Sequence, residues 1–154
     1  MGAKDLMIGD WVFKDMNWSE EYPPYNGLDY QLYQIESGDD IDLACETNCI
    51  GDEDIYQFIP LTPEILELNG FIHVYTGSVE SKYYKRIMNE QGSAAINVYF
   101  EKDMDVKVLV QIETELKAIC GVNKIHNCEI EHVHILQHAL RLCGLREFAD
   151  NFKV

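Results

Sequence analysis

Residues 129–144, EIEHVHILQHALRLCG, form the stretch of sequence that most constrains how this chain can fold. At about 100° per residue, a helix over residues 130–143 lines up Leu136 with Leu140 and carries apolar residues around roughly half of its circumference. An apolar arc of this width requires burial against another element. Gly144 then fits the left-handed position that follows a helix. We therefore predict a long C-terminal helix, residues 130–143, that covers a sheet.

Two histidines of this helix have the spacing of a zinc-protease motif. His134 and His138 stand at i and i+4 on the polar stripe of the helical wheel, as in HExxH. In that motif the glutamate after the first histidine is the general base, and here that position is Ile135. Arg141, one turn from His138, would repel a cation. We therefore expect no metal and no other cofactor, with His134 and His138 kept as the alternative metal ligands.

A second group of potential ligands surrounds these histidines in the sequence. Its spacing matches no known zinc module, so buried thiols and surface imidazoles are the simpler interpretation. The competing interpretation is a cryptic metal-dependent enzyme that uses this cluster. Its members are Cys120, His126, Cys128, His132, His134 and His138.

Length and cysteine content indicate a soluble intracellular chain. At 154 residues and 47% hydrophobic content, the chain suits one compact domain or two small lobes. No apolar run reaches the roughly 18 residues of a membrane span, and no signal-peptide pattern is present. Five cysteines, an odd number, favour reduced thiols over a disulfide framework. We expect a cytoplasmic location and no membrane partner.

The acidic residues are concentrated in one half of the chain. The formal net charge is −15, and between Asp15 and Ser81 there are 15 carboxylates but no Lys or Arg. The remaining 12 acids are matched by all 12 bases. This distribution disfavours direct nucleic-acid binding, which needs cations to neutralise phosphates. It favours a basic protein partner; the alternative is a surface that only aids solubility.

Two acidic clusters and one aromatic loop supply the candidate partner-binding residues. Exposed aromatic side chains anchor many interfaces, and acidic clusters attract basic partners. We therefore expect a non-enzymatic acidic interaction module that docks a basic partner, and in a sharper version a nucleic-acid mimic. The candidate contact residues are Trp18, Tyr22 and Tyr25 on the loop and Asp39, Asp40, Asp42, Asp52, Glu53 and Asp54 in the exposed acidic clusters.

The sequence of the N-terminal half predicts a set of short strands. Alternating segments at 6–13, 30–35, 41–45 and 55–59 predict strands, with a long aromatic loop between the first two. Four or five short strands with one long early loop predict a small SH3-like β-barrel lobe over residues 1–60.

The second half combines a short helix with a sheet. In PLTPEILELNG, Thr62 is the expected N-cap, Pro63 the first helical residue and Gly70 the stop, which predicts a linker helix over residues 62–69. An antiparallel meander follows, with strands at 71–75, 82–88, 94–100, 106–119 and 124–128. The expected fold class is α+β, with a second lobe over residues 61–154 whose sheet the C-terminal helix covers.

Three stretches carry a resemblance to a known family. LMIGDWV at 6–12, IPLTPEILELNGF at 59–71 and HVHILQHALRLCGL at 132–145 resemble segments of small uncharacterised proteins of gut bacteria and their phages or mobile elements. Members of that family commonly have a glutamate where this chain has Ile135. The resemblance implies no activity, and the change at Ile135 argues against HExxH chemistry in this chain.

Overall fold

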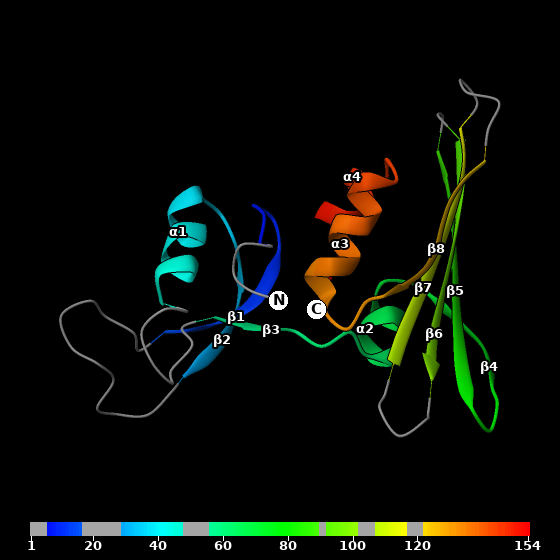
Figure 1. Ribbon diagram of the computed structural model, residues 1–154, viewed down its shortest axis with the longest axis horizontal. Helices are drawn as coiled ribbons and strands as arrows, with labels where there is room; N and C mark the ends of the chain where they lie inside the picture. The colour runs from blue at the N-terminus through cyan, green and yellow to red at the C-terminus, as the bar shows by residue number, and fades with distance from the viewer. Residues whose placement is uncertain (1–5, 17–28, 48–55, 90–91, 102–106, 117–121) are drawn as a thin grey trace. The chain divides into compact units, whose positions relative to one another are not determined.

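The computed structural model describes residues 6–16, 29–47, 56–89, 92–101, 107–116 and 122–154 of the chain. By its own internal contacts the chain divides into two units, Met1–Ile59 (unit 1) and Pro60–Val154 (unit 2) (Figure 1). Both units mix helices with antiparallel sheets, so the expected α+β class is confirmed. No helix among the described residues is long and apolar enough to cross a membrane.

Unit 1 is built on a three-stranded antiparallel sheet and one helix. Its strands are β1 (Trp11–Asp15), β2 (Tyr30–Gln34) and β3 (Tyr56–Phe58), in the order β2-β1-β3. Helix α1 (Gly38–Thr47) follows β2. A small core of buried apolar side chains joins the sheet to α1, with Tyr33, Ile41 and Phe58 packed against it. Its fully described members are Leu6, Val12, Ile35 and Tyr56.

The expected SH3-like barrel is not confirmed, and one of its predicted strands is wrong. The described strands of unit 1 form an open sheet, and the segment 41–45 lies within helix α1. The segment has the alternating pattern expected of a strand, with Ile41, Leu43 and Cys45 separated by Asp42 and Ala44. The helix forms because Ser37 and Asp40 cap its N-terminus. This capping signal favours a helix, whereas the apolar alternation of the same segment predicts a strand.

Unit 2 contains a five-stranded antiparallel meander. The strands are β4 (Ile72–Thr76), β5 (Glu80–Asn89), β6 (Gly92–Glu101), β7 (Lys107–Leu116) and β8 (Val122–Glu129), paired in chain order. Alternate residues of β6 and β7 are buried, which defines the core face of the sheet. The meander was predicted from the same alternation, and each of its strands is present.

Three helices complete unit 2: α2 (Pro63–Leu68), α3 (Val133–Leu142) and α4 (Arg146–Asp150). Figure 1 shows α3 and α4 on one side of the sheet. Lys85 of β5 places its Nζ 5.0 Å from the centre of the Phe148 ring of α4, and Phe71 and Phe148 have ring centres 6.3 Å apart. The helices therefore pack on the core face of the sheet.

The single long C-terminal helix expected over residues 130–143 is not confirmed. Residues before Val133 are extended, because Pro60 forms a β-bridge with His132 and the Leu61 amide donates to the Glu131 carbonyl at 2.8 Å. Helix α3 therefore has ten residues, and α4 follows it as a separate turn. These backbone contacts with the start of unit 2 are long-range in sequence, so helical periodicity alone could not reveal them.

Both ends of α2 and the C-terminal end of α3 follow the prediction from their sequences. Thr62 Oγ1 accepts a hydrogen bond from the Ile65 amide, and Pro63 opens α2. Gly70 and Gly144 have φ of 74° and 77°, in the left-handed region that favours glycine. Phe71 and Leu145 then donate their amides back to the carbonyls of Leu66 and Leu140, which completes a Schellman motif at each helix end.

Candidate functional site

The Asp40 side chain caps the helix in which it lies. The Asp40 amide donates to Ser37 Oγ at 3.3 Å, and the Ser37 amide donates in return to Asp40 Oδ2 at 3.2 Å. This reciprocal pair is a capping box, with Ser37 as N-cap and Asp40 as the third helical residue. The Glu36 amide and the Ser37 hydroxyl also donate to Oδ2, at 3.2 and 3.1 Å.

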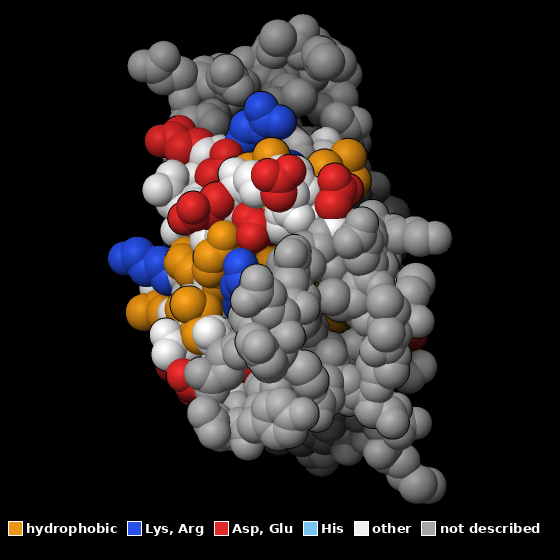
Figure 2. Space-filling model, turned by 90° about the vertical axis from the view of Figure 1, so that its left-hand side faces the viewer, with side chains coloured by type: hydrophobic (Ala, Val, Ile, Leu, Met, Phe, Trp, Pro, Cys, Tyr) orange, Lys and Arg blue, Asp and Glu red, His pale blue; other side chains and the backbone are white. Residues whose placement is uncertain are grey.

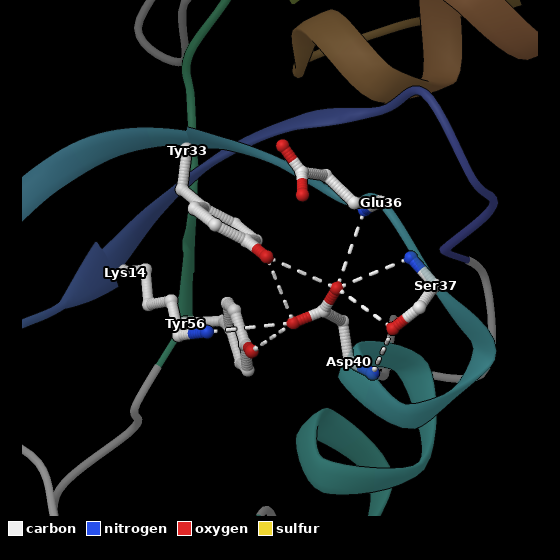
Figure 3. A network of polar contacts seen from close by, with 6 residues as sticks. All are labelled: Lys14, Tyr33, Glu36, Ser37, Asp40 and Tyr56. Atoms are coloured by element: carbon white, nitrogen blue, oxygen red, sulfur yellow. Dashed lines mark hydrogen bonds and ion pairs between the residues drawn. The ribbon is translucent and has the colours of Figure 1, made fainter.

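Two strands send hydroxyl groups to the same carboxylate. Tyr33 of β2 donates its hydroxyl to Asp40 at 3.1 Å, and Tyr56 of β3 donates to Oδ1 at 3.3 Å. Lys14 of β1 places Nζ 3.4 Å from Oδ1 and 4.3 Å from the centre of the Tyr33 ring. Figure 3 shows these side chains converging on Asp40 from β1, β2 and β3. We call Lys14, Tyr33, Ser37, Asp40 and Tyr56 the Asp40 network.

The electrostatics of the Asp40 network keep its carboxylate charged and its phenols neutral. Burial acts to raise the pKa of Asp40, but hydrogen bonds from Glu36, Tyr33 and Ser37, with the charge of Lys14, lower that pKa below its ordinary value. Burial raises the pKa of both Tyr33 and Tyr56, and the Asp40 charge adds to this effect. Each group is thereby stabilised in the form that holds the hydrogen bonds.

The geometry suits a structural role for Asp40 better than a chemical one. A carboxylate offers about four lone-pair sites, and Asp40 already accepts from two phenols, one serine hydroxyl, two backbone amides and a lysine. A general acid near neutral pH requires a raised pKa, whereas the pKa of Asp40 is lowered. Asp40 thus joins α1 to the sheet. The expectation that Asp40 is exposed is wrong, because its side chain is buried.

Its neighbours in the acidic cluster do face solvent. Asp39 and Asp42 of α1 are exposed, as are Glu36 and Asp29. Figure 2 shows acidic side chains gathered on this face of the molecule with hydrophobic side chains beside them. We call Glu36, Asp39 and Asp42 the α1 acidic group. Asp39 and Asp42 are the predicted contact residues that the structure describes as exposed, and Glu36 is an addition that the sequence analysis did not predict.

The charge balance of unit 1 is strongly one-sided. Residues 1–59 contain 14 carboxylates and two lysines, Lys4 and Lys14. Among the residues described for this unit, Lys14 is the one cation, and it is engaged by Asp40. No described cation in unit 1 is therefore left to offset the α1 acidic group.

Six predicted contact residues lie outside the described residues. They are Trp18, Tyr22, Tyr25, Asp52, Glu53 and Asp54. Whether the aromatic loop and the second acidic cluster take part in binding therefore stays a prediction.

The histidines of α3 do not form the predicted polar stripe. His134 is fully buried, with 0% exposure, and His138 is half-buried, with their ring centres 5.9 Å apart. The expectation that His134 faces solvent is wrong. Helix α3 also packs against α4, where Gln137, one turn after His134, donates to the Ala149 carbonyl. Within the described part of the chain, no group of three His, Cys, Asp or Glu side chains could hold a metal. The side chains of Cys120, His126 and Cys128 are not among those described.

The remaining members of the Asp40 network were not predicted. The Ser37-to-Asp40 spacing is a capping-box signal and could have been recognised. The approach of Lys14, Tyr33 and Tyr56 depends on strand pairing across up to 26 residues and has no local signal.

Comparison of the chain with family models, with curated proteins and with solved structures finds no match.

Proposed function

We propose that this chain is a non-enzymatic binding module whose acidic unit 1 docks a basic protein partner. The observation that carries the proposal is the α1 acidic group, Glu36, Asp39 and Asp42, which is exposed while the described cation of the same unit is engaged by Asp40. Complementary charge of this kind raises association rates and fixes orientation more than it raises affinity. We therefore expect binding that is fast at low ionic strength and is weakened steeply by salt.

A rigid presentation of the acidic side chains supports the same proposal. The capping box and the two phenols hold the first turn of α1 against the sheet. Side chains on a fixed helical turn lose less conformational freedom on binding than side chains on a free loop. Asp40 therefore acts indirectly, as the residue that positions the α1 acidic group.

The test compares two variants with the same change in charge. Glu36→Gln with Asp39→Asn and Asp42→Asn neutralises the α1 acidic group and keeps Asp40. The control, Glu67→Gln with Glu131→Gln and Glu147→Gln, removes three exposed carboxylates from unit 2. Tryptophan fluorescence confirms folding of unit 1, because both tryptophans, Trp11 and Trp18, fall in its sequence.

Binding is measured against lysine- and arginine-rich peptides and against basic proteins captured from a cell lysate, at several salt concentrations. We expect the wild type and the unit 2 control to bind a common basic partner, and the α1 variant to lose at least tenfold in association rate. Equal binding by both variants, or no basic partner for the wild type even at low salt, would overturn the proposal in favour of an acidic surface that only aids solubility.

A further inference from the structure

We draw no further inference here: the strongest candidate, the hollow of about 320 Å³ between the end of β5 and the turn from α3 to α4, has a largely apolar lining that includes Ile87, Met88, Leu145 and Phe148, and nothing in the structure shows what covers it.

Discussion

At the scale of single residues, Asp40 shows how one carboxylate can hold together segments that are far apart in sequence. It receives hydrogen bonds or an ion pair from β1, β2, β3 and the turn before α1. Replacing a buried acceptor of this kind destabilises the folded state, because each donor that loses its partner stays buried without a hydrogen bond. The stability of unit 1 should therefore depend on Asp40 far more than on its acidic neighbours.

We predict that Asp40→Asn destabilises unit 1 by about 1–3 kcal/mol, the usual cost of disrupting buried hydrogen bonds to a charged group. Asparagine turns one acceptor into a donor, which then faces the hydroxyls and amides that donated to Asp40. Urea unfolding followed by tryptophan fluorescence measures this change. The control is Asp39→Asn in the same turn, where exposure limits the effect to less than about 1 kcal/mol; equal effects at the two positions would contradict the structural role of Asp40.

The Asp40 network also predicts how unit 1 responds to pH. Because the pKa of Asp40 is lowered from its ordinary value of 3.8, its stabilising contribution is present above that pH and is lost as pH falls through the folded-state pKa. The pKa values of Tyr33 and Tyr56 are raised from 10.0, so their contribution is present below pH 10.0 and is lost as pH rises through the higher folded-state values.

We therefore predict that unit 1 loses stability both below pH 3.8 and above pH 10.0. Denaturant midpoints across this range, measured by tryptophan fluorescence, test the prediction. Asp40→Asn should flatten the acid side of the profile, and Tyr33→Phe should reduce the loss on the alkaline side. An acid profile that is identical in wild type and Asp40→Asn would mean that other groups control it.

At the scale of elements, the sequence predicted best where the signals are local. Alternation located the five strands of the meander, and Thr62, Pro63 and Gly70 located the ends of α2. The same approach failed for α1, where a spacing of two between Ile41 and Leu43 suggested a strand. Alternation and helical periodicity overlap in so short a segment, and the cap decides between them.

Local sequence patterns could not predict which side chains of α3 are buried by contact with another helix. By residue type, Leu142 is expected to face the core and Gln137 to face solvent, but Leu142 is 85% exposed and Gln137 is 0% exposed. The reason is α4, which folds back against α3: Gln137 Nε2 donates to the Ala149 carbonyl at 2.9 Å. No periodicity in α3 encodes that contact.

We predict that Gln137→Ala destabilises unit 2 by about 1–3 kcal/mol, because it leaves the buried Ala149 carbonyl without this donor. Sequence alone would have predicted little change. Thermal unfolding followed by circular dichroism at 222 nm measures the effect, since three of the four described helices, α2, α3 and α4, belong to unit 2.

Two leucines of α3 provide the reference values for Gln137→Ala. Leu140 is fully buried, so Leu140→Ala should lower the free energy of unfolding by about 2–5 kcal/mol. Leu142→Ala should cost less than about 0.5 kcal/mol, as for other surface positions. If Gln137→Ala behaves like Leu142→Ala, the contact between α3 and α4 does not contribute to stability.

At the scale of the whole molecule, charge is divided unevenly between the two units. Unit 1 has 14 carboxylates and two lysines, whereas unit 2 has 13 carboxylates and ten basic residues. Repulsion among the carboxylates of unit 1 destabilises its folded state and is screened over about 8 Å at physiological ionic strength. The two units should therefore differ in their response to salt.

We predict that moderate sodium chloride raises the unfolding midpoint of unit 1 and changes that of unit 2 much less. Tryptophan fluorescence reports on unit 1 alone, and circular dichroism is dominated by the sheet and helices of unit 2. Glu36→Gln with Asp39→Asn and Asp42→Asn should reduce the effect of salt on unit 1. Parallel shifts of both units with salt would instead indicate a general effect on solvation.

Strand β4 lies at one edge of the unit 2 sheet, and its five side chains are all exposed, with Ile72 at 67% and Val74 at 52%. Its pairing with β5 shifts between His73 and Tyr75, so Val74 is an extra residue in the strand. An exposed edge strand without Lys, Arg, Asp or Glu favours stacking of one molecule on the next into fibrils, and a bulge prevents the flat, continuous contact that such stacking requires. Deleting Val74 should therefore shorten the lag time of fibril growth, measured by thioflavin T fluorescence at high protein concentration, whereas Val74→Thr, which keeps the bulge, should lengthen it or leave it unchanged.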